Sequence, residues 1–377
     1  MNKRINIYLL NIIIFLQGLI FYAPIATIYR EKRGVSISQI FLIESIFMIL
    51  IILLEIPWGK FADKVGYKRT LILANFIFFL SKIIFFRADS FFMFLIERVL
   101  LAISISGISG CDSALLFLSL DEKDNSEKVF ASYNFFSNSG FLLGSILSTF
   151  IINVSMDLAA FYTIITYGFA FLLSFFLKDV NGKSSESVGI IKNLKCVLEK
   201  RNILVLVISI ALISEVVQSI TVFLNQGIYI KSGIDIKYFG LILALIQIIT
   251  LISIKSYKIT NKIGQKTTIK LFIMIIFISS FSLIFIRNGF LAITTIALIE
   301  TSSSFIVPIF ADIQNKSIKT VDRATLLSIY SMLGSIISAV INPVIGFAAN
   351  YSLEGALIVC SLISLISMIF IGVNKAK

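Results

Sequence analysis

The sequence predicts an all-α integral membrane protein, with twelve membrane-spanning helices in two pseudo-symmetric halves of six. Three observations predict it: extreme hydrophobicity, twelve long apolar runs, and a motif that recurs in degraded form in the second half. Of the 377 residues, 58% are hydrophobic and only 14% are charged, and the mean hydropathy is +0.97. A soluble domain carries about 25% charged residues, so this chain cannot cover its surface with polar groups, and lipid must be its solvent.

Each apolar run is long enough to cross a bilayer as a helix, which takes roughly 20 residues. The runs cover residues 5–29, 38–58, 70–86, 91–115, 129–153, 158–177, 203–225, 238–254, 268–286, 289–309, 324–347 and 353–373. Lys3 and Arg4 precede the first run, as in a signal peptide. That run is too long for the apolar region of a signal peptide and lacks a convincing small-residue cleavage site, so we expect it to be the first spanning helix.

The distribution of basic residues predicts the orientation in the membrane. With the N-terminus inside, 24 of the 33 Lys and Arg residues fall on the cytoplasmic side. Seven fall outside, among them Arg30, while Lys82 and Arg98 lie within spans. We therefore expect a multi-pass protein of the cell inner (cytoplasmic) membrane with both termini cytoplasmic. Its net charge of +12 then reflects topology and contact with anionic lipid headgroups rather than nucleic-acid binding.

The longest polar stretch, residues 178–202, divides the chain into an N-terminal half (1–177) and a C-terminal half (203–377). The first part of this stretch has the composition of a flexible linker. The second part places Ile191, Leu194 and Leu198 at helical spacing among lysines, which predicts a short helix on the inner membrane surface.

A glycine-containing basic motif connects the second and third spans. It reads GKFADKVGYKRT from Gly59 to Thr70, and a degraded copy, TNKIGQKT, follows the eighth span about 198 residues later. Three positions are matched in the copy: Asp63 by Asn261, Gly66 by Gly264, and Lys68 by Lys266. Repeated halves of this kind are typical of transporters, which place the substrate site between them near the bilayer midplane.

The motif resembles the loop 2–3 signature G-x-x-x-D-x-x-G-x-[RK]-[RK] of the major facilitator superfamily, and the helix count, central loop and repeat extend this resemblance over the whole chain. The resemblance implies a secondary transporter whose motif latches the two halves on the cytoplasmic side. The residues expected to contribute to this gating are Gly59, Asp63, Gly66, Lys68, Arg69, Glu55 and Asp112. Gly59 and Gly66 would allow close backbone approach and a sharp turn. Alternatively, the basic residues of the loop only fix the topology.

The chain departs from the pattern of proton-coupled drug antiporters of this superfamily. Arg98 is followed by Ala102 where that pattern has glycine, and the fifth span carries Gly140-x-x-x-Gly144 without a proline. These residues leave the direction and coupling of transport open. The spacing of small residues still predicts tight helix packing.

Two acidic residues lie deep in predicted spans. Glu215 is about twelve residues into the seventh span and Glu300 about eleven residues into the tenth. A charge at this depth costs roughly 2.5–3.5 kcal/mol on insertion scales, so each residue needs a reason. Because the family fold lines its cavity with helices 1, 4, 7 and 10, the resemblance places both acids there, where they would bind a cation or a proton. The alternative is a structural acid hydrogen-bonded to a neighbouring helix.

Other polar residues in the spans are weaker candidates. Arg98, Gln17 and Gln218 are candidates for contacting the substrate, with Glu97 as a possible counter-ion of Arg98. Each glutamine could equally form hydrogen bonds between helices. We expect Lys82 to carry its amine toward the end of its helix by snorkelling and to have no functional role.

These observations favour a secondary transporter over an enzyme or a sensor. The chain has no G-x-x-x-x-G-K-[ST] loop for ATP hydrolysis, and no histidine or paired aspartates within a span for membrane catalysis. The short loops and tails leave no room for the output domain of a sensor. The 35 Phe residues and the few charged residues in spans favour an amphipathic or drug-like solute, with proton-coupled export preferred over uptake of a small metabolite. We expect a monomer whose partners are the solute, protons and lipid, without cofactor, metal or nucleic acid.

Overall fold

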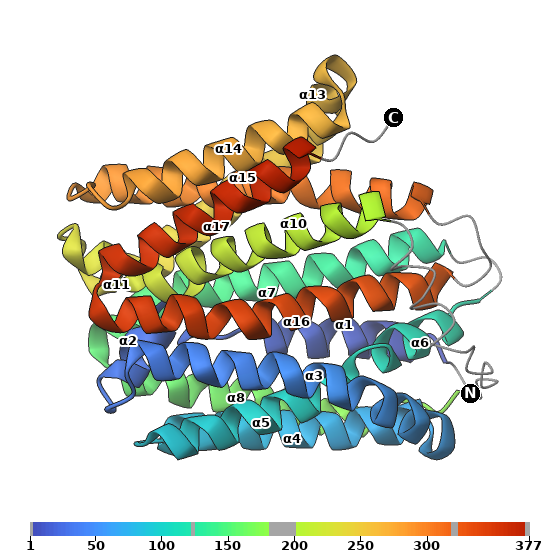
Figure 1. Cartoon of the computed structure of the whole chain (residues 1–377). Helices are drawn as coiled ribbons and strands as arrows, with labels where there is room; N and C mark the ends of the chain where they lie inside the picture. The colour runs from blue at the N-terminus through green and yellow to red at the C-terminus, as the bar shows by residue number, and fades with distance from the viewer. Residues whose placement is uncertain (1–2, 122–124, 181–200, 318–322, 374–377) are drawn as a thin grey trace. The chain divides into compact units, whose positions relative to one another are not determined.

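The computed structural model describes residues 3–121, 125–180, 201–317 and 323–373 (Figure 1). These residues form helices joined by short turns, and none of them is in a strand. Contacts between Cα atoms divide the chain into two compact units. Unit 1 comprises Met1–Val35, Ile46–Ser185 and Ile236–Ala244, and unit 2 comprises Ser36–Ser45, Glu186–Asp235 and Leu245–Lys377. The short surface helix expected around residues 191–198 lies outside the described residues.

Unit 1 is built from long apolar helices that pack in pairs. Its elements are α1 (Ile5–Gly18), η1 (Ala23–Ile25), α2 (Ala26–Glu31), most of α3 (Ile37–Val65), α4 (Tyr67–Arg87), α5 (Phe91–Ile108), α6 (Cys111–Leu118), α7 (Ser126–Val154), α8 (Met156–Ser174), η3 (Ile236–Tyr238) and the first part of α12 (Phe239–Thr250). Helix α4 packs against α5 and α8, and α1 packs against α7 and α8.

Unit 2 repeats this packing. Its elements are the first part of α3, α10 (Arg201–Gln218), the π-helical turn η2 (Ser219–Leu224), α11 (Asn225–Lys231), the rest of α12, η4 (Leu251–Lys255), α13 (Ser256–Ile263), α14 (Gln265–Ser282), α15 (Gly289–Ser317), α16 (Arg323–Tyr351) and α17 (Leu353–Val373). Helix α14 packs against α15 and α17 as α4 does against α5 and α8, and α10 packs against α16 and α17 as α1 does against α7 and α8.

Eleven segments of the described chain are long and apolar enough to span a membrane. They correspond to all but one of the predicted runs. The remaining run corresponds to α14, which has only 18 residues and carries Lys266 and Lys270 near its start. Its packing in unit 2 matches that of the spanning helix α4 in unit 1, so the architecture is the predicted one of twelve helices.

The internal repeat extends to backbone conformation. Gly66 and Gly264, the motif glycines 198 positions apart, both begin a helix with a positive φ, of 96° and 80°. Gly34 and Gly233 form a second matched pair, with φ of 82° and 78°, in the turns that follow α2 and α11. Side chains other than glycine rarely adopt this region, so the same turn is encoded twice by the same residue type.

An ion pair is also repeated. Arg33 contacts Asp157 in the first turn of α8, at 2.6 Å, and Lys231 contacts Glu354 in the first turn of α17. The basic partners are 198 positions apart and the acidic partners 197. One pair ties the turn after α2 to the first turn of α8, and the other ties the end of α11 to the first turn of α17.

The predicted tight packing at Gly140 and Gly144 is confirmed. A Cβ on Gly140 would lie 2.2 Å from the main-chain oxygen of Phe15, and one on Gly144 would lie 3.1 Å from the Cα of Leu19. Only glycine lets α7 approach α1 this closely.

The motif glycines behave differently from each other. Gly66 makes the expected turn between α3 and α4, whereas Gly59 lies inside α3 and has no atom within 4 Å of an added Cβ. The expectation of a close approach or turn at Gly59 is therefore wrong, because α3 continues seven residues further than the predicted second span, to Val65. The predicted fourth span is also interrupted, since Gly110 turns the chain with a φ of 79° between α5 and α6.

Candidate functional site

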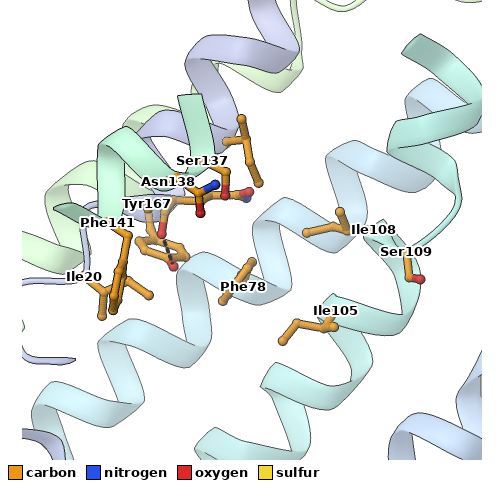
Figure 2. A pocket seen from close by; sticks show the side chains of 12 residues that line it. Ile20, Phe78, Ile105, Ile108, Ser109, Ser137, Asn138, Phe141 and Tyr167 are labelled. Carbon is orange, nitrogen blue, oxygen red and sulfur yellow. Dashed lines mark hydrogen bonds between the residues drawn. The ribbon is translucent and has the colours of Figure 1, made fainter. Parts of the chain in front are cut away.

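A pocket of about 420 Å³ lies within unit 1, where α1, α4, α5, α7 and α8 face one another (Figure 2). Its apolar wall comes from Ile14, Ile20, Phe78, Ile105, Ile108 and Phe141. Its polar groups come from Gln17, Ser109, Ser137, Asn138 and Tyr167. An apolar cavity with a few polar groups is the usual form of a site for a small organic molecule.

The pocket lies at mid-depth of its helices. Gln17 is near the middle of the span Ile5–Glu31, and Asn138 is near the middle of Ser126–Val154. The amide nitrogen of Gln17 donates to Asn75 Oδ1 at 2.5 Å, and the Tyr167 hydroxyl donates to the Gln17 main-chain oxygen at 2.7 Å. Gln17 thus forms the hydrogen bond between helices that was one expectation for it, and it also lines the pocket, as a substrate-contacting residue would.

Glu215 lies in a polar cluster of unit 2. Its side chain is 1% exposed, and its Oε1 accepts a hydrogen bond from Ser219 at 3.5 Å. Ser338, Glu44 and Cys360 are also near it, and Gln218 reaches Glu44 with an Nε2–Oε1 distance of 3.5 Å. Among the described residues, Oε2 of Glu215 has no hydrogen-bond partner. The structure therefore brings Glu215 and Gln218 into one cluster.

Glu300 is half-buried near the middle of the span Gly289–Lys316. The Thr221 side chain bonds to its carboxyl group, and Tyr229 is also near it. Its Oε2, like that of Glu215, lacks a partner in the described chain. A carboxyl group with one unpaired oxygen in an apolar span has the capacity to take up a proton or a ligand donor.

The sequence suggested Glu97 as the counter-ion of Arg98, but the structure pairs Glu97 with Arg30 instead. Glu97 is fully buried and its Oε2 lies 3.8 Å from an Nη of Arg30, which is itself 5% exposed. Arg30, expected outside the membrane, lies over the rings of Phe85 and Phe94, at 5.2 and 5.7 Å from their centroids. Adjacent residues on a helix point in different directions, so Glu97 reaches inward to α2 while Arg98 does not share its face.

Lys82 also contradicts its expectation, because it does not snorkel. It is 3% exposed, and its amine donates to the Tyr22 hydroxyl at 3.0 Å. Phe78 and Tyr167 place their ring centroids 4.9 and 5.0 Å from the same amine. Aromatic faces and a phenol oxygen thus solvate this ammonium group inside the unit.

Arg98, proposed as a cavity residue, is half-buried, with its guanidinium group 4.7 Å from the ring centroid of Phe47. It is not among the residues that line the pocket of unit 1. The structure therefore does not bring Arg98 together with Gln17.

The gating residues lie at the end of unit 1 where α3 meets α4 and α5 meets α6. Asp112 accepts hydrogen bonds from the Tyr133 hydroxyl at 2.7 Å and from the Ser113 main chain at 2.6 Å, which ties α6 to α7. Asp63 is exposed near Tyr67 and Cys111. Of the other predicted gating side chains, Glu55 and Arg69 are exposed and Lys68 is half-exposed.

Sequence reasoning missed the buried cations Arg30 and Lys82 and the pocket residue Tyr167. A signal for Lys82 exists, since it falls one helical turn after Phe78 in a run rich in aromatic residues. Arg30 carried no such signal, because it lies beside Lys32 and Arg33 in what reads as a basic loop.

Comparisons with known proteins agree with this architecture. The family model described as Major Facilitator Superfamily matches residues 7–341. The quinolone resistance protein NorA of Staphylococcus aureus is 25% identical over 191 residues, which is 50% of this chain and 48% of that protein. This chain therefore matches about half the length of the curated relatives.

Solved structures share the fold over the full length. The nucleoside transporter NupG has a TM-score of 0.84 at 12% identity, with 100% of both chains covered. A bacterial homolog of the human lysosomal transporter Spinster, solved in an inward-facing and unoccupied conformation, has a TM-score of 0.80 at 12% identity, with 99% and 97% covered. With a family match spanning most of its length and a fold of twelve helices in which each unit repeats the packing of the other, the chain belongs to the major facilitator superfamily of membrane transporters.

Proposed function

We propose that the chain exports a small amphipathic organic solute across the cytoplasmic membrane by alternating access, in exchange for protons. The observation that carries the proposal is the pocket of unit 1, at mid-depth of its helices and large enough for a compact organic molecule. Its aromatic and aliphatic walls suit a hydrophobic body, and its amide and hydroxyl groups suit one polar end. The similarity to a quinolone resistance protein supports export of such a compound.

Glu215 and Glu300 are the groups proposed to carry protons. Each is in the middle of a span, and each has one oxygen without a hydrogen-bond partner in the described chain. A carboxyl group that gains and loses a proton as it faces alternate sides of the membrane would couple solute movement to the proton gradient. Asp63 and the neighbouring motif residues are proposed to stabilise one of the two states.

The remaining features of the proposal concern topology and assembly. The distribution of basic residues favours both termini in the cytoplasm, and a reporter fused to the C-terminus would test this. We propose that the chain works as a monomer. The whole transport cycle would then lie within one chain.

The experiment has a cellular and a purified arm. An efflux-deficient bacterial host would express the chain, Glu215→Gln, Glu300→Gln and Asp63→Asn at matched levels, and growth would be measured against antibiotics and amphipathic compounds. Glu31→Gln is the matched control, because Glu31 is an exposed acid at the end of its span. Solute flux in liposomes, with an imposed pH gradient of either sign, would establish direction.

We expect resistance from the wild type and from Glu31→Gln, and its loss in both mid-span variants. Resistance that survives both Gln substitutions would overturn the coupling role. Solute accumulation instead of resistance would favour the alternative, an uptake permease for a small metabolite. No solute movement in either direction would favour a non-transporting sensor.

A further inference from the structure

Buried charged side chains in the described chain fall into two sets of opposite net charge. Unit 1 buries Arg30, Lys82 and Glu97, which are 5%, 3% and 0% exposed. Unit 2 buries Glu44 and Glu215, at 2% and 1% exposed. Unit 1 therefore holds an excess positive charge, whereas the buried charged groups of unit 2 are both acids.

The described residues of unit 1 thus bury two cations and one acid, which leaves one positive charge in excess. Glu97 lies 3.8 Å from Arg30 and is also near Tyr167, whose ring contacts the Lys82 amine, so this one acid faces both cations. The partners of that amine are the Tyr22 hydroxyl and the rings of Phe78 and Tyr167. These groups solvate the cation without neutralising it.

The Lys82 amine lies against two residues of the pocket wall. Phe78 and Tyr167 contact the Lys82 amine with their rings and also line the pocket. Figure 2 shows both side chains at the pocket. A cation already lies over both rings, so these rings attract a second cation from the pocket less well, while the positive potential attracts an anion.

We propose that Lys82 sets the charge preference of this pocket, which takes amphipathic solutes whose polar end is anionic, such as aromatic carboxylates, in preference to amphipathic cations. This inference rests on the proposed binding of an amphipathic solute in the pocket, and it names the class. Lys82 acts through the Phe78 and Tyr167 wall and not by direct contact. Across one ring, in a partly open pocket, the expected preference for an anion over a matched cation is about tenfold.

The test measures binding, so it does not depend on transport. The purified full chain in detergent would be titrated with dansylglycine, an anion, and dansylcadaverine, a cation, which share one fluorophore. Lys82→Met removes the charge and keeps an unbranched side chain, while Lys82→Arg keeps the charge. Lys258→Met is the control, because Lys258 is an exposed lysine of unit 2. Ile105→Trp fills the pocket.

We expect the wild type, Lys82→Arg and Lys258→Met to bind dansylglycine about tenfold more tightly than dansylcadaverine. In Lys82→Met the two dyes should bind with similar affinity. Ile105→Trp should weaken the binding of dansylglycine. A ratio of affinities is insensitive to a uniform loss of folded protein, so misfolding of Lys82→Met does not imitate the result. Equal or inverted affinities in the wild type, or a ratio unchanged by Lys82→Met, would overturn the inference and leave the proposed function intact. Failure of the wild type to bind either dye, or binding unaffected by Ile105→Trp, would overturn the pocket assignment itself.

Discussion

Replacing Glu97 with glutamine should strongly destabilise unit 1. The substitution keeps the shape of the side chain but removes the acid that lies 3.8 Å from Arg30, in a site where the two side chains are 6% and 0% exposed. Loss of one partner from a buried ion pair costs about 3–5 kcal/mol. Because the pair is long, at 3.8 Å, and Arg30 keeps its contacts with Phe85 and Phe94, we expect the lower end of that range.

The chain offers a direct readout of this loss. Cys111 in unit 1 and Cys360 in unit 2 are buried free thiols, at 4% and 0% exposed. A thiol-reactive dye in a thermal ramp would report when each becomes accessible, on a Cys196→Ser background that removes the third thiol. Glu97→Gln should lower the midpoint for Cys111 by several degrees relative to the wild type.

Two further variants make the reasoning refutable. Glu31→Gln changes an exposed acid one residue from Arg30 and should alter stability by less than about 0.5 kcal/mol. Adding Arg30→Met to Glu97→Gln removes the buried cation as well and should recover about 2 kcal/mol. If Glu97→Gln is no more destabilising than Glu31→Gln, the buried ion pair does not exist as described, and the charge balance assigned to unit 1 fails with it.

The same assay tests three other features. Gly140→Ala should cost about 2–4 kcal/mol because its Cβ would lie 2.2 Å from the Phe15 oxygen, whereas Gly334→Ala, with no atom within 4 Å, should be neutral or stabilise by up to about 1 kcal/mol. Equal effects of the two would contradict the close approach of α7 to α1. Gly66→Ala should cost about 1–2 kcal/mol because it forces a side chain into a φ of 96°; a neutral result would refute that turn. Asp157→Asn should cost less than about 1 kcal/mol, since the Asp157 side chain is 61% exposed, and a larger loss would show that its ion pair with Arg33 is more than a surface contact.

The fold could be predicted from the sequence because lipid imposes a constraint that is readable along the chain. A helix must be apolar over its full span, so hydropathy alone located the helices, and the motif copy 198 residues later predicted the repeat. The position of a residue along a spanning helix also gives its depth in the membrane, so the sequence alone places Glu215 and Glu300 at mid-span.

The charged interior of unit 1 could not be predicted in this way, because it depends on how helices rotate and bend. Arg30 follows Pro24 and a break after Gly18, and only the resulting direction of α2 carries it inward to Glu97. The sequence predicts that Lys82 reaches the membrane interface, because its stem is long enough to snorkel, but in the structure its amine donates to Tyr22. The spacing of apolar residues alone predicts neither the direction of α2 nor the direction of the Lys82 side chain.

The sign of the solute charge has a consequence for coupling that can be measured. In an exchanger, proton binding and solute binding must weaken each other, and this coupling is reciprocal. For a cationic solute, competition with protons for the same acids would suffice. For an anionic solute, as we infer here, a protonated acid is a better electrostatic neighbour than an ionised one. The mutual exclusion of proton and solute must therefore come from a difference in their affinities for the two conformations.

This requirement yields a prediction whose sign separates export from uptake. Glutamine imitates a protonated glutamate, so in a proton-coupled exporter Glu215→Gln should bind dansylglycine more weakly than the wild type, by about fivefold or more. Glu354→Gln is the control, because Glu354 lies at the end of its span in an ion pair with Lys231. Tighter binding in Glu215→Gln would mean that proton and anion bind together, the property of a symporter, and would move the assignment from export to uptake. An unchanged affinity would remove Glu215 from the coupling mechanism, because a group that does not discriminate between the two states cannot shift them.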